Sequence, residues 1–400
     1  MKINLQTYLI SNLVALFEVR GAGVYLVGGC VRDLFRKQGV DFEQMYYLSC
    51  KDFKDIDLLI TGLSQERILQ VLKQHRIKHD VVGKSFGVIK VWYEGNEIDI
   101  ALPRTEKSTG EKHTDFEVVV DHNLAIEDDL LRRDFTINAI AIDLITGEII
   151  DPFGGLKNLE KGLIQTLTPQ SFKDDPLRML RGIQFAARFK FELSYDTLAQ
   201  IHENKYKVRS ISPERITTEL TKGLANPQVM YHLLHTTGLD IMLFETPYLN
   251  LENNHFLLQN TKTLMEFLLS FPFVDLSLLR LTRDQMKERD ALLLLKHAEE
   301  NDQNPQTVYR ALRIYPKVIE TKVFQKLLPV LRDFENKVYP NNLSDLVLRG
   351  HDLMDMGIKN DAIGAVLNNL VDDIIAGSVK NTKTELIQRI KQHYKYGNNI

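Results

Sequence analysis

Cysteine is scarce in this chain of 400 residues, which contains only Cys30 and Cys50. The two form no Cys-x-x-Cys pair, and no His/Cys group has the spacing of zinc ligands, so we expect neither a disulfide framework nor a structural metal. Stretches of about 18 apolar residues are also missing, as are the basic and apolar regions of a signal peptide. These absences predict a protein of the cytoplasm that does not associate with membranes.

A strong overall charge is missing too, because the formal net charge is −3. This value argues against a uniformly basic nucleic-acid binder, but contacts with phosphates depend on local patches of charge. Between residues 178 and 215, eight Lys and Arg face four acids, and after residue 379 five Lys and Arg face one acid. Both runs are compatible with ordinary solvated helix surface as well as with RNA binding.

The hydrophobic pattern changes along the chain. Short β-rich runs alternate with helical stretches over the first 150 residues, which is typical of an α/β unit. Long segments with helical periodicity follow from about residue 175. We therefore predict an α/β head with a mixed sheet, followed by an all-α neck, body and tail. Clusters of turn-forming residues place these parts at 1–150, 151–225, 226–338 and 339–400.

A pair of glycines marks the first candidate site. Gly28 and Gly29 follow a predicted strand and precede a predicted helix, so backbone N–H groups should lie exposed at the helix N-terminus, where they can bind phosphate. Close backbone packing is an equally common reason for such a pair. Arg32 favours the functional interpretation, because a guanidinium beside the turn can hold a triphosphate in bidentate fashion.

Carboxylates define the second candidate site. Asp55 and Asp57 are separated by one residue in an apolar run, so on a strand both would face the same side. Carboxylates that close repel one another unless a cation lies between them, and their oxygens suit Mg²⁺. The pair thus favours two-metal nucleotidyl transfer, although two acids on the solvent face of an edge strand are also common. Asp99, on a predicted strand of its own, is a candidate third catalytic carboxylate.

The order of these motifs resembles a known family. GGCVRD followed by DID is similar to the head of the nucleotidyltransferase superfamily, and RRDFTINAIA is similar to a motif of its class II branch, which contains bacterial CCA-adding enzymes and poly(A) polymerases. The resemblance covers residues 24–225, with a weaker part in the tail. It implies that Arg133 contacts the nucleotide and that Asp134 and Asn138 shape the sugar pocket. Residues 37–54 depart from the family pattern and look like an inserted surface loop.

Selection of the base is assigned to the neck. Asp175, Arg178 and Arg181 are spaced three apart, so we expect them to lie near one another along a helix surface. Cytosine and adenine both present an amino donor beside a ring-nitrogen acceptor, which a carboxylate and a guanidinium would recognise together. A helix-capping acid with surface arginines is the structural alternative. The resemblance favours a protein template made of Asp175 and Arg178, with Glu214 and Arg215 in support.

The tail supplies the last motif. Residues 348–387 resemble the part of bacterial CCA-adding enzymes that holds the elbow of tRNA, with Asn360 or Asp361 as the predicted cap of a helix. The resemblance as a whole implies addition of CCA to tRNA from CTP and ATP with two Mg²⁺ ions, and no DNA partner. A poly(A) polymerase or A-adding enzyme is the alternative within the same chemistry, and the run at 82–92 favours CCA addition. A non-catalytic RNA-binding protein is the alternative of another class.

Overall fold

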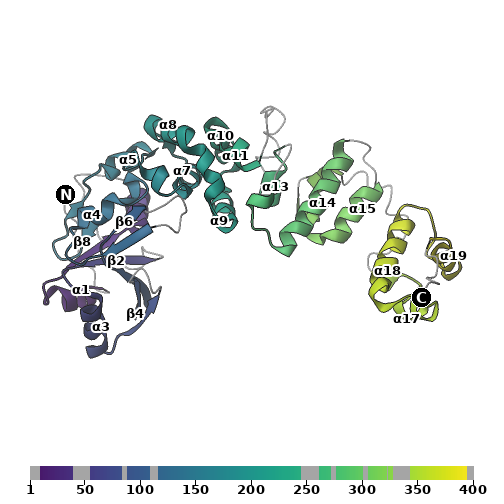
Figure 1. The fold of residues 1–400 in the computed structure, drawn as a ribbon, viewed down its shortest axis with the longest axis horizontal. Helices are drawn as coiled ribbons and strands as arrows, with labels where there is room; N and C mark the ends of the chain where they lie inside the picture. The colour runs from purple at the N-terminus through teal and green to yellow at the C-terminus, as the bar shows by residue number, and fades with distance from the viewer. Residues whose placement is uncertain are drawn as a thin grey trace. The chain divides into compact units, whose positions relative to one another are not determined.

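The computed structural model has two compact units (Figure 1). Unit 1 comprises Met1–Asn250 with Phe273–Arg280, and unit 2 comprises Leu251–Pro272 with Leu281–Ile400. The predicted division into four parts is finer than this and stays a prediction. The residues that the structure describes are 10–38, 55–82, 88–108, 116–244, 261–271, 276–300, 305–321, 323–327 and 343–393. The predicted inserted loop therefore lies almost entirely outside the described residues, as does part of the run at 82–92.

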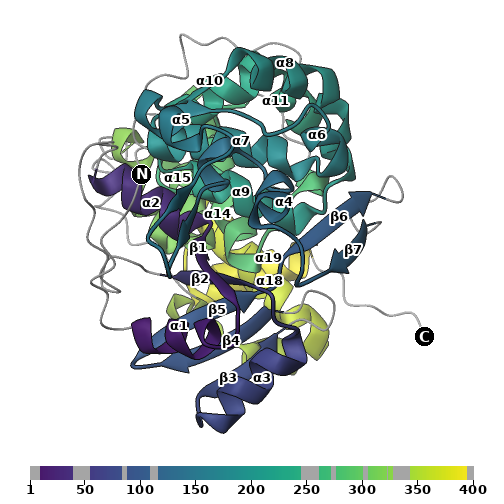
Figure 2. The ribbon, with the colours of Figure 1, turned by 90° about the vertical axis from the view of Figure 1, so that its left-hand side faces the viewer.

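A mixed sheet of seven strands forms the head of unit 1 (Figure 2). Its strand order is β3-β4-β5-β2-β1-β8-β9. The strands are β1 (Gly23–Val27), β2 (Ile56–Thr61), β3 (Lys78–Val82), β4 (Val88–Tyr93), β5 (Asn96–Ala101), β8 (Ala141–Asp143) and β9 (Ile149–Ile150). Strands β6 (Arg104–Ser108) and β7 (Phe116–Val120) follow β5 in the chain and form a separate antiparallel pair.

Pairing at the centre of the sheet fixes the position of the predicted carboxylates. Strand β2 runs antiparallel to β1 and parallel to β5, and in this register Asp57 lies opposite Asp99. Leu58 and Leu59 of the same strand are fully buried, which anchors the strand in the core. Asp55 precedes β2 and is exposed, so only Asp57 of the predicted pair lies within the strand.

Helices surround the sheet and continue the unit. Helix α3 shows why they form where they do: Ser64 caps it by accepting a hydrogen bond from the backbone N–H of Arg67, and Ile68, Val71 and Leu72 make its buried face. Helix α7 packs against α9 and α10. The helices used below are α2 (Gly29–Gln38), α4 (Ile126–Leu131), α6 (Ser171–Asp174), α7 (Leu177–Phe189), α9 (Pro213–Gly223), α10 (Pro227–Thr237) and α11 (Leu239–Phe244). One short parallel pair, β10 (Leu163–Ile164) with β11 (Glu192–Leu193), lies among them.

Unit 2 is helical in its described part and ends in its own hydrophobic cluster. Leu353, Leu370, Ile375 and Leu386 are among the buried members of this cluster. Its helices are α13 (Leu264–Leu268), α14 (Arg283–Glu300), α15 (Pro305–Ile314), α17 (Gly350–Asp355), α18 (Asn360–Ile375) and α19 (Lys383–His393). The predicted fold class, an α/β head followed by helices, is confirmed. None of the described helices is long and apolar enough to cross a membrane.

One predicted detail of the tail is wrong. The N-cap of α18 is Lys359, which makes no side-chain capping bond, and Asn360 and Asp361 already belong to the helix. Asp361 instead places a negative charge in the first turn, where the helix dipole favours it. The helix therefore begins at the predicted place without the predicted cap.

Candidate active site

The Gly-Gly turn lies between a strand and a helix, as the sequence predicts. Gly28 connects β1 to α2 with a φ of +80°, in the left-handed region that favours glycine. A Cβ at this position would lie 3.2 Å from Nη1 of Arg133 and 3.4 Å from Oδ2 of Asp57. A side chain would thus crowd both the basic and the acidic side of the turn, and glycine keeps the backbone open between them.

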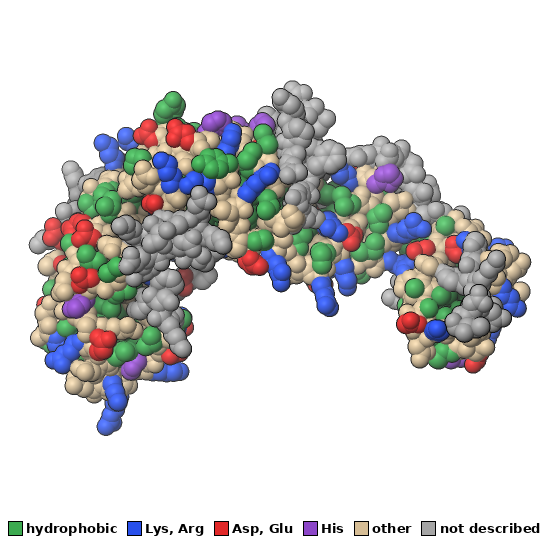
Figure 3. All heavy atoms as spheres, viewed as in Figure 1, with side chains coloured by type: hydrophobic (Ala, Val, Ile, Leu, Met, Phe, Trp, Pro, Cys, Tyr) green, Lys and Arg blue, Asp and Glu red, His purple; other side chains and the backbone are tan. Residues whose placement is uncertain are grey.

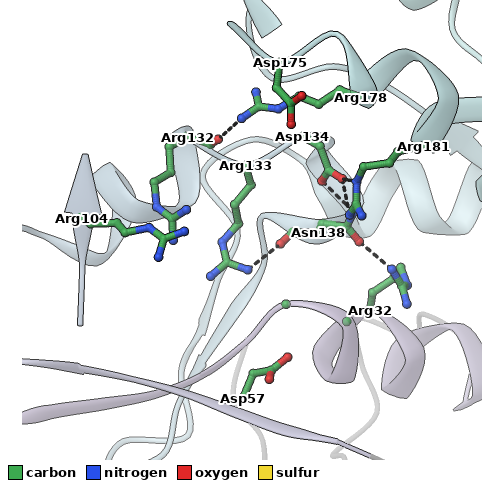
Figure 4. Close-up of a pocket in the computed structure, with 12 residues that line it drawn as sticks. Arg32, Asp57, Arg104, Arg132, Arg133, Asp134, Asn138, Asp175, Arg178 and Arg181 are labelled. Atoms are coloured by element: carbon green, nitrogen blue, oxygen red, sulfur yellow. Dashed lines mark hydrogen bonds and ion pairs between the residues drawn. The ribbon is translucent and has the colours of Figure 1, made fainter. Parts of the chain in front are cut away.

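A cavity of about 400 Å³ opens at this turn (Figure 4). Six of its lining residues are arginines and three are aspartates, so the fixed charge around it is predominantly positive and favours an anionic ligand. Ten of the twelve predicted site residues line it, and only Asp55 and Asp99 do not. The lining residues are Gly28, Gly29, Arg32, Asp57, Arg104, Arg132, Arg133, Asp134, Asn138, Asp175, Arg178 and Arg181.

One end of the cavity is a closed network of polar side chains. Asp134 accepts hydrogen bonds from Arg181, with Nε to Oδ2 at 2.8 Å, and from the amide of Asn138, with Nδ2 to Oδ1 at 2.8 Å. The other side of the same amide accepts from Nη1 of Arg32 at 2.8 Å. Burial alone would raise the pKa of Asp134, but Arg181 and Asn138 outweigh it and hold the pKa below its ordinary value. This carboxylate therefore remains ionised and fixed in place.

Two aromatic rings of α7, Phe185 and Phe189, pack against Arg32. Its guanidinium carbon lies 5.1 Å from the ring centre of Phe185 and 4.8 Å from that of Phe189, and the two rings are stacked on each other. Such cation–π contacts are strongest when the partners are desolvated, and all three residues are buried. Asp33 pairs with Arg32 from the same helix. Arg32 is thus oriented before any ligand binds.

A fully buried carboxylate that the sequence analysis missed holds two further arginines. Asp129 of α4 accepts from Nη2 of Arg133 at 3.0 Å and from Arg132 at 2.8 Å. The spacing i,i+3 and i,i+4 on a helix would have been the signal for this anchor. Arg104 and Arg132, which line the cavity, were also missed, although Arg132 is the first residue of the motif RRDFTINAIA.

The residues predicted to recognise the base, Asp175, Arg178 and Arg181, line the cavity, but they do not share one face of a helix. Asp175 precedes α7 in an extended conformation, because Pro176 is the N-cap of that helix. Its carboxylate pairs with Arg215 of α9, with Oδ2 to Nη2 at 3.1 Å, whereas Arg178 donates to the backbone carbonyl of Arg132 at 2.6 Å. The expectation that Asp175 shares a helix surface with the arginines is therefore wrong. The expected support by Arg215 is a direct ion pair.

A different part of the cavity, the carboxylate end, contains Asp57 and no closed network. Of the predicted catalytic acids, Asp57 lines the cavity, and Asp99 lies opposite it on the neighbouring strand. Burial and the nearby charges of Asp99 and Asp55 raise the pKa of Asp57, while Arg133 opposes the shift. Carboxylates this close repel one another, and a hard divalent cation bound by their oxygens would reduce that repulsion. The residues present therefore fit a metal ion at Asp57.

The carboxylates do not form a complete metal cage by themselves. Among the described residues, no group of three or more His, Cys, Asp and Glu side chains could hold a metal ion. Mg²⁺ commonly binds through one or two carboxylates together with phosphate oxygens and water, which agrees with an open site of this kind.

Two family models match the chain. Residues 24–165 match the poly A polymerase head domain, and residues 190–250 match a probable RNA and SrmB-binding site of polymerase A. The first match contains the Gly-Gly turn, Asp57 and the whole Arg133–Asn138 segment. Over residues 24–165 the chain is thus similar to the poly A polymerase head-domain family. This is the family that the sequence motifs predicted.

Curated relatives match about half of the chain. A "Multifunctional CCA protein" of Neisseria gonorrhoeae is 37% identical over 227 residues, which are 55% of this chain and 50% of the relative. One of Xanthomonas campestris pv. campestris is 35% identical over 222 residues, 54% of this chain and 49% of the relative. The chain thus spans about half the length of these curated relatives.

Solved structures extend the likeness of the fold to nearly the whole chain. An apo CCA-adding enzyme is 24% identical with a TM-score of 0.62 over 95% of this chain and 94% of the other. A Thermotoga maritima CCA-adding enzyme complexed with tRNA is 24% identical with a TM-score of 0.55 over 96% of each chain. At this level of identity the comparison concerns the fold, including the helices that follow the head domain.

Proposed function

We propose that this protein extends the 3′ end of RNA without a template and builds CCA on tRNA from CTP and ATP. The observation that best supports this function is the cavity, where one surface combines an open Gly28–Gly29 turn, an acid at Asp57 and an arginine-rich wall. A nucleoside triphosphate with its Mg²⁺ can use all three kinds of contact. The matched relatives are named for CCA, and solved relatives of this fold were obtained with ATP, with CTP and with tRNA.

The phosphates would lie against the turn and the basic wall. The first N–H groups of α2 would bind the triphosphate together with Arg32, through the guanidinium hydrogens that Asp33 and Asn138 leave unused. Arg133 would contact the nucleotide near Asp57, because Nη1 of Arg133 and the carboxylate of Asp57 both lie beside Gly28. The network of Asp134 and Asn138 would form the edge of the sugar pocket.

The carboxylate end would bind Mg²⁺. Asp57 and Asp55 would hold the ion, with Asp99 as a neighbouring carboxylate. When bound, Mg²⁺ supplies acidity to the attacking 3′-hydroxyl and neutralises charge on the pyrophosphate leaving group. The protein's own contribution is to hold both substrates beside this end, so that the reacting groups meet in a fixed orientation.

Choice of the base would depend on Asp175 and Arg178. The carboxylate of Asp175 already accepts from Arg215 and from the backbone N–H of Leu177. A carboxylate has about four lone-pair positions, so the amino group of C or A can still be accepted. A uracil or guanine would present a carbonyl there instead, and each buried group left unpaired costs about 1–3 kcal/mol.

The tail would position tRNA through its phosphates. Several of its basic side chains are paired with acids, as in the ion pairs of Lys383 with Asp352 and Arg389 with Asp373, and side chains of both charges appear on the face seen in Figure 3. Lys380 and Lys391 are exposed. Replacing both lysines by Glu should weaken tRNA binding and make its salt dependence shallower, by about 0.7–0.9 in slope per lost phosphate contact. Lys73→Glu on α3 is the control for a general change of charge.

The direct test of the proposed function is an incorporation assay. Purified protein is incubated with tRNA that ends at the discriminator base and with each nucleoside triphosphate, alone and combined. Ordered addition of two C and one A supports the proposal. Addition of A alone, or of a long A tail, would replace it by the A-adding or poly(A) function that the name of the head-domain model also suggests. Binding of tRNA without any incorporation would contradict both. A cytoplasmic location is part of the same proposal.

A further inference from the structure

A row of three charged side chains crosses three neighbouring strands at the carboxylate end of the cavity. Asp57 of β2 lies opposite Asp99 of β5, and Asp99 in turn lies opposite Lys90 of β4. Directly opposite residues in paired strands project from the same face of a sheet. Figure 2 shows the three strands side by side. Lys90 is therefore on the same face as the acid that lines the cavity, two strands away.

Lys90 contacts the middle member of this row. Its Nζ lies 3.4 Å from Oδ1 of Asp99, and this oxygen is shielded from solvent and makes no hydrogen bond to another described residue. Lys90 is thus the cation nearest to this oxygen among the described ion pairs, while the Asp99 side chain as a whole is 42% exposed. The lysine side chain is 27% exposed, which leaves it partly dehydrated and close to the sheet.

Lys90 has a second acidic partner. It also donates a hydrogen bond to Oε1 of Glu97, which stands two residues before Asp99 on β5 and is exposed. Side chains two apart on a strand face the same side, so one ammonium group lies between two carboxylates. Lys90 is thus shared between Asp99 and Glu97.

We propose that Lys90 is an internal counter-ion that competes with a divalent cation for Asp99 and thereby weakens metal binding at the candidate active site. The inference rests on the proposed function in that the cation is the one that Asp57 would hold. An ammonium group and a divalent cation beside one carboxylate repel each other, and each reduces the charge available to the other. Glu97 counteracts this effect by holding Lys90 away from Asp99.

Two substitutions should change metal affinity in opposite directions. Lys90→Met removes the competing charge and should tighten Mn²⁺ binding about twofold to fivefold, the range of a partly exposed ion pair. Glu97→Gln leaves Lys90 with Asp99 as its remaining partner and should weaken Mn²⁺ binding by a similar factor. In the Lys90→Met background, Glu97→Gln should have a clearly smaller effect, because the two residues act through the same ammonium group.

Lys78→Met is the matched control for charge. Lys78 is an exposed lysine on β3 whose Nζ lies over the ring of Trp92, so its loss removes the same charge from the same sheet without touching Asp99. Mn²⁺ affinity is measured from the electron paramagnetic resonance signal of free Mn²⁺, without nucleotide or RNA. Circular dichroism verifies that each variant is folded, and Lys90→Gln serves as the second variant if Lys90→Met is not.

The outcomes separate this inference from the proposed function. Tighter binding in Lys90→Met, weaker binding in Glu97→Gln and affinity within about 1.5-fold of wild type in Lys78→Met would support it. Equal effects of Lys90→Met and Lys78→Met would overturn it, because only the general charge would then matter. Asp57→Asn is measured alongside: if it leaves Mn²⁺ binding unchanged, the metal assignment in the proposed function is wrong, whatever Lys90 does.

Discussion

The two ends of the cavity place carboxylates in opposite surroundings. Asp134 is buried among donors, with Arg181 and Asn138 bonded to its oxygens, and its pKa is lowered. Asp57 is partly buried beside another acid, Asp99, and its pKa is raised by burial and by that charge. The first carboxylate is stabilised by residues of its own chain. The second is destabilised until a cation or a ligand reaches it.

This difference separates positioning from chemistry. A network whose partners are all present holds its side chains in one geometry before the ligand binds, which reduces the cost of ordering them later. Carboxylates that repel one another store unfavourable energy, and binding a cation releases it. We infer that the network of Asp134 shapes the nucleotide pocket, and that the cluster around Asp57 binds the cation that the reaction requires.

The largest expected effect is on catalysis at the carboxylate end. Asp57→Asn keeps the shape of the side chain and removes the charge, so RNA extension should fall by about a thousandfold, since loss of a metal ligand costs several kcal/mol in the barrier. Binding of tRNA should change little, because phosphate contacts provide most of it. Single-turnover incorporation measures the first quantity and filter binding the second. Activity within about tenfold of wild type would show that Asp57 is not a metal ligand.

The next effect is on stability at the closed end. Asp134→Asn leaves Arg181 without its carboxylate partner and should lower the free energy of unfolding by about 2–3 kcal/mol. Asp57→Asn should instead leave the free energy of unfolding unchanged or raise it by up to about 1 kcal/mol, because it relieves repulsion. Urea unfolding of the two variants at neutral pH compares them directly. A similar loss of stability in both would mean that the two ends do not differ in the way described.

Acid should act on the closed end through Asp134. Its pKa is lower in the folded state than in the unfolded state, so its stabilising contribution is complete above the unfolded value of about 4 and is lost as the pH falls through the folded value. The wild type should therefore lose stability below about pH 4 more steeply than Asp134→Asn. Unfolding curves between neutral and acid pH test this. Parallel curves would show that Asp134 contributes nothing to the acid sensitivity.

The smallest expected effect concerns base choice. Asp175→Ala removes the acceptor for the amino group of C and A, so the preference for CTP over UTP should fall about tenfold, as for one lost hydrogen bond, while total incorporation falls modestly. Arg215→Ala keeps that acceptor but removes its ion-pair partner, and should lower the preference for CTP less than Asp175→Ala does. Competition between CTP and UTP in single turnover gives the ratio of kcat/KM. An unchanged ratio in Asp175→Ala would place the selection elsewhere.

The sequence predicted the local features of this site better than the contacts between distant segments. The turn at Gly28 and the strand of Asp57 follow from short patterns, because glycine pairs and apolar alternation act over a few residues. The pairing of Asp57 with Asp99 depends on which strands become neighbours, which no local pattern specifies. Asp175 was placed on a helix because its spacing fits one, but Pro176 begins that helix after it.

The role of Asp129 was missed for a related reason. A buried acid beside arginines looks like a surface ion pair in the sequence, and only the fold shows that its side chain is fully enclosed while it holds Arg132 and Arg133. In the tail, the basic run after residue 379 is compatible with solvated helix surface and with RNA binding. The structure pairs Lys383 and Arg389 with acids that stand 31 and 16 positions away in the chain.

Thermal unfolding with and without Mg²⁺ tests the contrast between the two ends most directly. A ligand that binds only the folded state raises the melting temperature with its concentration. Millimolar Mg²⁺ should therefore raise the melting temperature of the wild type and of Asp134→Asn, whose baseline is lower, and should have no such effect on Asp57→Asn. An equal rise in wild type and Asp57→Asn would contradict the account, because Mg²⁺ would then bind elsewhere than at the carboxylate end.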